Sequence, residues 1–419
     1  MSTMINKLTV GVELPELYLV KQHFDDYAVL NVEKSVVRCL NSGELPDLKG
    51  QRVGIAVGSR GIANIDGIVK STVAWVKNRG GIPFILPAMG SHGGGTEAGQ
   101  VGVLASLGIS EARIGAVIRG SVAVVEVGRV YGQPVYFSQE ALMADLLILI
   151  NRVKPHTAFR GDRESGLTKM LAIGLGKQKG AETIHGLGLG LSAETIPQFA
   201  DVIMRAAPPI FGLALIENAY HRIAQMELLS GDQFSAKEPA LLIKAKALMP
   251  TFPVSIFDVL VVEQIGKNIS GDGMDPNITG RYATPYASGG ADINKVVVLG
   301  LTNETHGNGN GIGMADLTTN HVLDSIDWEV TYVNALTATV TTTIKRPLAL
   351  SSDDAAVRLA IRLATSNPDA ITLIRVRDTL SLEHVLVTKT VLDTVSNRPF
   401  QVEGGPFKWR DAPWKHCWD

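Results

Sequence analysis

Cysteine is scarce in this chain of 419 residues, which contains only two, Cys39 and Cys417, far apart in the sequence. A small secreted scaffold stabilised by disulfides needs cysteines at a much higher density, and neither cysteine has the spacing of a metal-ligand motif. The sequence therefore favours a protein of a reducing compartment.

An excess of one charge is also missing, because 39 basic residues stand against 41 acidic ones. This balance argues against broad electrostatic attraction to nucleic acid or to an anionic membrane. No apolar run approaches the length needed to cross a bilayer, and the first ten residues lack the pattern of a signal peptide. We therefore expect small-molecule partners, no nucleic acid, no membrane and a cytoplasmic location.

The remaining composition, 45% hydrophobic and 19% charged, is that of an ordinary soluble globular protein with two or perhaps three domains. The proline-containing break at 250–253 is the predicted domain boundary. We expect an amino-terminal catalytic and cofactor-binding domain over 1–250 and a smaller α/β domain over 251–395 that closes the active-site cleft. The tryptophan-rich segment 396–419 is expected to pack back on the body.

Strand, glycine loop and helix alternate in the first half of the chain. The run 52–57 (RVGIAV) predicts a strand, and apolar residues at helical spacing follow over 65–76. A second strand over 82–86 precedes a helix that Thr96 would cap, and the apolar run 145–150 (DLLILI) predicts a buried parallel strand. This alternation predicts an α/β fold with a doubly wound, mostly parallel sheet.

The second half repeats this order with predicted strands at 258–262, 295–301 and 371–376 and a helix at 355–364. Within the first domain, residues 116–137 predict shorter strands with a turn at Gly132, either an inserted hairpin or an edge of the sheet. A second, smaller α/β domain is therefore expected.

Three polar side chains stand in loops that follow predicted strands of the first domain. Arg60 lies in GSRGIAN, His92 in MGSHGGGT and His156 in KPHT. Parallel strands place their carboxyl ends at one edge of a sheet, where ligands of open α/β sheets bind. We therefore expect the three side chains at a common site.

The stretch that follows contains an isolated lysine, Lys169, in SGLTKM and a histidine, His185, sixteen residues later in a second glycine-rich segment. Small residues allow a bound group to approach the backbone closely, and a single amine in an apolar turn is suited to covalent attachment. This stretch is predicted to be a functional site.

The order and spacing of these residues resemble the nickel-dependent lactate racemase family. The resemblance implies a nickel-pincer nucleotide attached covalently at Lys169, a nickel ligand at His185, and His92 and His156 as acid and base. It also implies that the enzymes that make this cofactor are partners of the chain.

The same resemblance implies contacts with the substrate by Arg60, Gln264 and Lys267, the last two matched by spacing after the strand at 258–262. An arginine suits bidentate contact with a carboxylate. The residues expected at the cofactor phosphate are small and lie near a predicted helix amino terminus; they are Gly161, Ser165, Gly166, Gly174 and Gly176.

The activity implied is that of an isomerase, a racemase or epimerase that inverts the 2-carbon of a 2-hydroxy acid. The C–H bond beside an ionised carboxylate is poorly acidic, so the family resemblance implies hydride transfer instead of simple proton abstraction. Two histidines suit the accompanying exchange of the hydroxyl proton, because the usual pKa of histidine lies near neutrality.

The chain departs from the family where the substrate would bind. Val57 stands where lactate racemases have an acidic residue, and Gly93–Gly95 replace their arginine and proline. We therefore expect a larger or more polar 2-hydroxy acid than lactate. The polar residues available for its extra groups are Asn268, Asp272, Asn277 and Arg281.

Two other functions fit parts of the sequence. A nicotinamide-dependent dehydrogenase would explain the glycines after the first strand, but GSRGIAN lacks the G-x-G-x-x-G pattern and no acidic residue ends the next strand. A protein that binds a nucleotide or a metal without racemase activity is the other alternative, and retained metal without exchange of the substrate C–H would identify it.

Overall fold

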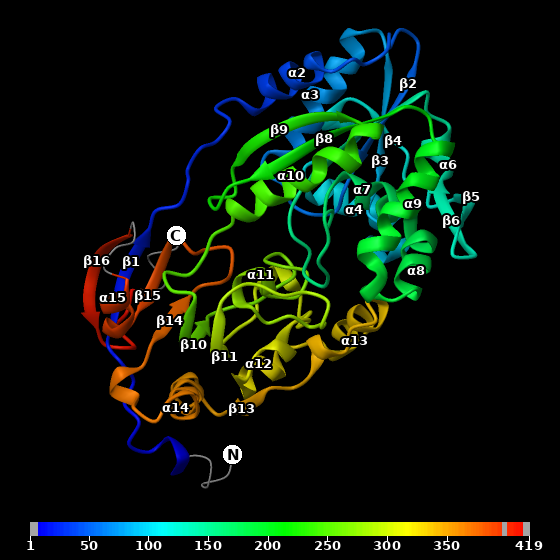
Figure 1. Cartoon of the computed structure of the whole chain (residues 1–419). Coiled ribbons are helices and arrows are strands. Elements are labelled where there is room, and N and C mark those ends of the chain that lie inside the picture. The colour runs from blue at the N-terminus through cyan, green and yellow to red at the C-terminus, as the bar shows by residue number, and fades with distance from the viewer. Residues whose placement is uncertain (1–6, 396–399, 414–419) are drawn as a thin grey trace. The chain divides into compact units, whose positions relative to one another are not determined.

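The computed structural model describes residues 7–395 and 400–413. The chain forms two compact units, which are divided between Met249 and Pro250. The continuous unit comprises residues 25–249, and the split unit comprises the described residues before 25 and after 249 (Figure 1).

The continuous unit is built on a six-stranded sheet in the order β4-β3-β2-β7-β8-β9. All neighbours are parallel except β9, which runs antiparallel to β8. The strand bounds are β2 Arg52–Val57, β3 Ile82–Pro87, β4 Val117–Ile118, β7 Leu146–Arg152, β8 Ile210–Glu217 and β9 Ile223–Ser230. The predicted mostly parallel sheet is confirmed.

Helices cover both faces of this sheet, because its central strand is apolar on both sides. Along β7, Ile148 and Ile150 belong to one buried cluster, while Leu147 and Leu149 belong to another. The first cluster is completed by α2 (Val32–Ser42), α3 (Ile65–Asn78) and α4 (Glu97–Ser106), and the second by α8 (Lys177–Gly186), α9 (Ser192–Ala206) and α10 (Phe234–Ala247) (Figure 1). The sheet is therefore doubly wound, as predicted.

Shorter elements complete the unit. The strands β5 (Val124–Val130) and β6 (Gln133–Ser138) form the predicted hairpin, and its turn has positive φ at Tyr131 and Gly132. The short helices are α5 (Glu111–Ile114), α6 (Gln139–Leu142) and α7 (Leu167–Lys169). As predicted, the Thr96 hydroxyl caps α4, accepting the amide of Gly99.

The split unit contains an eight-stranded sheet in the order β13-β12-β11-β10-β14-β15-β1-β16. The first five strands are parallel neighbours, and the last three run antiparallel. The bounds are β1 Leu17–Gln22, β10 Ile256–Val262, β11 Asp292–Val298, β12 Leu317–Thr319, β13 Leu348–Leu350, β14 Leu373–Val376, β15 His384–Val387 and β16 Phe400–Phe407. The helices are α11 Pro276–Thr279, α12 Asn320–Asp324, α13 Trp328–Thr337, α14 Asp353–Ala364 and α15 Lys389–Thr394.

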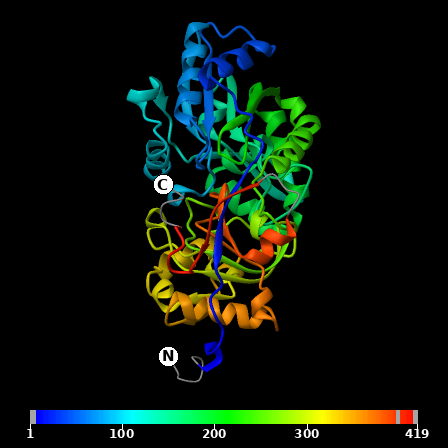
Figure 2. The ribbon, with the colours of Figure 1, turned by 90° about the vertical axis from the view of Figure 1, so that its left-hand side faces the viewer.

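The amino-terminal strand β1 corrects the expected domain organisation, which assigned residues 1–250 to one domain. It pairs with β15 and β16 of the split unit, and the blue β1 lies beside the red β16 (Figures 1 and 2). The sequence pattern marks a strand's buried side chains, such as Leu17, but the backbone hydrogen bonds that select its neighbour leave no sequence signature.

The carboxyl-terminal segment lies on the split unit as far as it is described. The strand β16 pairs with β1, and Trp409 is buried with the guanidinium of Arg375 stacked over its ring at 4.4 Å. The other tryptophans of the predicted tail, Trp414 and Trp418, lie outside the described residues.

Candidate active site

Three loops of the continuous unit leave the carboxyl ends of neighbouring strands β3, β2 and β7. As predicted, Arg60 follows β2, His92 follows β3 and His156 follows β7. The side chains of Arg60 and His92 are exposed, and His156 is partly buried. The charge of Arg60 contributes to lowering the pKa of His156, so the loops bring these two groups near each other.

Lys169 and His185 join this group from the helical segment that follows β7. Lys169 is the last residue of α7, a π-helical segment continues over Met170–Gly174, and His185 lies in the last turn of α8. Such π-helical segments occur frequently at functional sites. Burial and the charge of Lys169 lower the pKa of both His156 and His185.

Both of these histidines are held in their neutral form near pH 7. Burial lowers the pKa of His156 well below its usual range, and the charges of Lys169 and Lys154 lower it further. Burial and the charge of Lys169 also lower the pKa of His185. A neutral imidazole keeps a lone pair on one ring nitrogen, so each ring is able to bind a metal ion or accept a proton.

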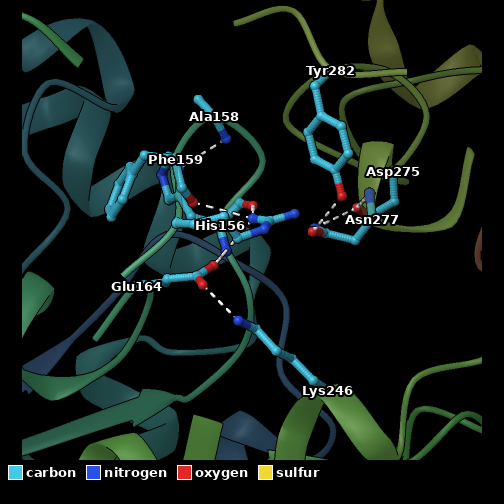
Figure 3. Close-up of polar contacts among 9 residues, drawn as sticks. His156, Ala158, Phe159, Glu164, Lys246, Asp275, Asn277 and Tyr282 are labelled. Atoms are coloured by element: carbon cyan, nitrogen blue, oxygen red, sulfur yellow. Dashed lines mark hydrogen bonds and ion pairs between the residues drawn. The ribbon is translucent and has the colours of Figure 1, made fainter. Parts of the chain in front are cut away.

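The His156 ring is fixed by its own loop (Figure 3). Its backbone amide donates to Glu164 Oε2 at 2.7 Å, and its Nδ1 accepts the amide of Ala158 at 3.1 Å. The ring of Phe159 stacks at 4.4 Å between centroids. Because Nδ1 is an acceptor here, the neutral ring carries its proton on Nε2.

His92 is held differently, by a serine that the sequence interpretation overlooked. The Ser59 Oγ lies 2.7 Å from His92 Nδ1. A serine hydroxyl rotates and both donates and accepts, so this contact allows either tautomer of the ring. His92 Nε2 is therefore able to take up or release a proton. A serine in a glycine-containing loop has no distinguishing sequence signal.

Buried carboxylates hold the loops in place. The Glu164 side chain is fully buried and accepts Arg160 Nη1 at 3.2 Å and Lys246 Nζ at 2.7 Å, besides the His156 amide (Figure 3). Glu217 accepts the amide of Ala63 at 2.7 Å, in the Arg60 loop, and pairs with Arg152. Nothing in the sequence distinguished these glutamates from surface residues.

A third carboxylate occupies the helix start where the cofactor phosphate was expected. Glu238 is buried and accepts the amides of Leu167 at 2.5 Å and Thr168 at 3.1 Å, as well as the Thr168 hydroxyl. Burial raises the pKa of Glu238, and these hydrogen bonds oppose the shift. A Cβ at Gly166 would overlap Glu238 Oε1, so close packing against this carboxylate explains why residue 166 is a glycine. A phosphate contact at Ser165 or Gly166 stays a prediction.

Gly174 joins the π-helical segment to the His92 loop. A Cβ at Gly174 would lie 2.6 Å from the carbonyl oxygen of Ala88, and its own carbonyl accepts the amide of Gly90 at 3.2 Å. Gly176 follows as the residue before α8, and Gly161 lies in the His156 loop. This close approach to Ala88 explains why residue 174 is a glycine. A contact of Gly161, Gly174 or Gly176 with the cofactor phosphate stays a prediction.

The glycine run after His92 corrects one interpretation of the sequence, that it leaves room for a larger substrate. Gly93 and Gly95 both have positive φ, and a Cβ at Gly93 would lie 2.5 Å from the backbone of Gly99. These two glycines therefore permit a tight turn against α4. Gly94 alone of the three faces open space.

The predicted substrate residues Gln264 and Lys267 belong to the split unit, in the loop after β10. The backbone amide of Gln264 donates to the carbonyl of Arg377 at 3.0 Å. Lys267 Nζ donates to the carbonyl of Gly271 at 2.6 Å, so the Lys267 side chain contacts the backbone of its own loop. Their contact with substrate stays a prediction.

Of the polar residues expected to meet extra substrate groups, Arg281 has a structural role. Its Nη2 donates to Asp316 Oδ2 at 2.9 Å and to the carbonyl of Ile293 at 2.8 Å. The Asn277 side chain lies between Asp275 and Tyr282, donating to Asp275 Oδ1 at 2.9 Å and accepting the Tyr282 hydroxyl at 3.2 Å (Figure 3). A specificity role for Asn268, Asp272 and Asn277 stays a prediction.

No group of three or more His, Cys, Asp or Glu side chains arranged to hold a metal ion occurs among residues 7–395 and 400–413. Over the same residues, no helix combines the length and the apolar character that a membrane span requires.

The chain matches no protein-family model and no curated protein. Among solved structures, it is similar to the lactate racemase apoprotein from Thermoanaerobacterium thermosaccharolyticum, with 13% sequence identity and a TM-score of 0.47. The match covers 85% of this chain and 93% of that one.

Proposed function

We propose that this chain is an isomerase that racemises or epimerises a 2-hydroxy acid, using a nickel-pincer nucleotide attached to Lys169. The proposal is supported by the loop of His156, which leaves the carboxyl end of the parallel strand β7, and by the charge of Lys169, which with burial lowers the pKa of His156 and His185. Ligands of open α/β sheets bind at this end of the strands.

The residues present fit such a cofactor. Lys169 supplies an amine for a covalent bond, and His185 supplies a neutral imidazole, a ligand that nickel accepts. A single protein ligand agrees with a cofactor that brings its own remaining donors. When bound, the nucleotide supplies an acceptor that takes hydride from the substrate and returns it.

The chain's own residues would then bind the substrate and move its hydroxyl proton. Arg60 is exposed and able to bind the carboxylate. His92 and His156 exchange the hydroxyl proton, one for each hand of the substrate. His156 must release the Ala158 amide from Nδ1 before that nitrogen takes a proton, and the Ser59 hydroxyl orients the His92 ring through its Nδ1.

The substrate class we propose is a 2-hydroxy acid other than lactate, because Val57 replaces the acidic residue of lactate racemases and their arginine and proline are absent after His92. Contacts by Gln264 and Lys267, closure of the site by the second domain and loading by cofactor-making enzymes belong to the same proposal.

The test is chiral conversion. Protein made together with the cofactor-making enzymes would be incubated with each enantiomer of a set of 2-hydroxy acids that differ in length and in the presence of a second carboxylate. The enantiomers of the product would then be separated by chiral chromatography. We expect conversion of at least one pair, and its loss in His92→Ala. If protein that carries the Lys169 adduct converts none of them and exchanges no 2-hydrogen, the alternative of a binding protein replaces the isomerase.

A further inference from the structure

Lys177 is a buried lysine for which the proposed chemistry has no use. Its side chain is fully buried at the start of α8, and its backbone has a φ of 57°, which few residues other than glycine adopt. Its Nζ donates to the carbonyl of Pro87 at 2.6 Å and to Gln100 Oε1 at 3.2 Å. Lys177 therefore joins α8 to the end of strand β3.

Gln100 extends this contact to the His92 loop. It is fully buried in α4, and its Nε2 donates to the carbonyls of Gly90 at 2.8 Å and His92 at 3.4 Å. Together Lys177 and Gln100 bind three carbonyl groups between Pro87 and His92. The loop itself contains several glycines with positive φ, so it has little stiffness of its own.

Burying the Lys177 ammonium group carries a large desolvation cost. Burial lowers the pKa of Lys177 to about 8, and the nearby carboxylates of Glu97 and Glu140 raise it only in part. An apolar side chain of similar length would avoid this penalty but would offer no donor to the carbonyls. The lysine is therefore better explained by what it binds than by packing.

We propose that Lys177 is a positioning residue, which fixes the backbone of the His92 loop through Pro87 and Gln100 so that the His92 imidazole is held in place for proton exchange. The catalytic meaning of this inference rests on the proposed function. The same helix that begins at Lys177 carries His185 in its last turn, so one element orients both the acid–base loop and the predicted nickel ligand.

The test compares Lys177→Met, which removes the donors, with Lys177→Gln, which keeps a neutral donor. Lys179→Met is the matched control, because Lys179 is exposed on the same helix. The first readout is the NMR titration of the His92 ring in protein without cofactor, assigned with His92→Gln. We expect a shifted or broadened His92 signal in Lys177→Met, a smaller change in Lys177→Gln and none in the control.

The second readout, on loaded protein, is turnover. We expect kcat to fall roughly 10- to 100-fold in Lys177→Met with a much smaller change in KM, because a misplaced proton acceptor affects the chemical step. A His92 titration in Lys177→Met that is identical to wild type would overturn the inference. This NMR result needs no cofactor, so it is separate from a failure of the proposed function, which would appear as wild-type protein that converts no substrate.

If Lys177→Met does not fold, Gln100→Leu gives the same test. It removes the bonds to Gly90 and His92 while leaving the Lys177 contact with Pro87. We expect it to disturb the His92 signal as well, and an undisturbed signal would contradict the proposal.

Discussion

The site loops of the continuous unit and the loop after β11 of the split unit all follow parallel strands, but different kinds of side chain hold them. In the continuous unit the holding groups are charged and buried: Glu164, Lys177, Glu217 and Glu238 each bind backbone atoms of a loop or of a helix start. These backbone segments are the ones that carry the predicted catalytic and cofactor-binding side chains.

In the split unit, the loop after β11 is held by neutral side chains. The Thr302 hydroxyl donates to Asn268 Oδ1 at 2.6 Å, and the Thr343 hydroxyl donates to Asn310 Oδ1 at 2.8 Å. Breaking a buried charged contact leaves an uncompensated charge, whereas breaking a neutral one leaves only an unsatisfied dipole. We therefore expect the site loops of the continuous unit to be the more sensitive to substitution and to pH.

The largest effect is expected for Glu238→Leu. The substitution leaves the amides of Leu167 and Thr168 and a buried hydroxyl without their acceptor, so the free energy of unfolding should fall by about 3–5 kcal/mol in urea denaturation. Lys237→Leu, at the exposed neighbouring position, is the control. A loss in Glu238→Leu no greater than in the control would remove the distinction between the units.

The next effect concerns pH and Lys177. Its pKa in the folded chain, about 8, lies below its usual value of 10.5, so the unfolded chain binds more protons between these values. The free energy of unfolding of wild type should therefore rise relative to Lys177→Met as pH increases from 8 to 10.5, by up to about 3 kcal/mol. Urea denaturation of both proteins across this range checks it, and a constant difference would show that the lysine is not desolvated.

A moderate effect is expected for Glu164→Gln. The amide oxygen is still able to accept the His156 amide, but the ion pairs with Arg160 and Lys246 are lost. We expect a loss of about 2 kcal/mol in the free energy of unfolding, measured by urea denaturation. Stability equal to wild type would mean that the two cations contribute nothing to this loop.

The smallest effect is expected in the split unit. Thr302→Val keeps the shape of the side chain and removes one neutral hydrogen bond, at a cost of about 1 kcal/mol in the same assay. A cost comparable to that of Glu238→Leu would show that the two units do not differ in the way proposed.

The sequence was informative where a repeating pattern carries the signal. Alternating apolar runs and glycine loops predicted β2, β3 and β7 and the doubly wound sheet, and the loop positions of Arg60, His92 and His156 followed from that order. Helix and strand periodicities depend on neighbouring residues, so a single sequence is enough to recognise them.

The sequence was uninformative where contacts join distant residues. Glu238 lies about seventy positions from the helix start that it binds, and β1 pairs with strands at the other end of the chain. The sequence does not distinguish a buried glutamate from an exposed one, and only the folded structure shows which carboxylate is desolvated. For this reason the predicted phosphate site did not anticipate Glu238.

The proposed function depends on Lys169 as the anchor of the cofactor, and the intact mass of denatured protein tests this attachment. Wild type, Lys169→Ala and Lys154→Ala would each be produced together with the cofactor-making enzymes, with Lys154 as the neighbouring lysine control. We expect a stable added mass on wild type and on Lys154→Ala that is absent from Lys169→Ala. Wild-type protein without any adduct under these conditions, or an adduct that persists in Lys169→Ala, would contradict it.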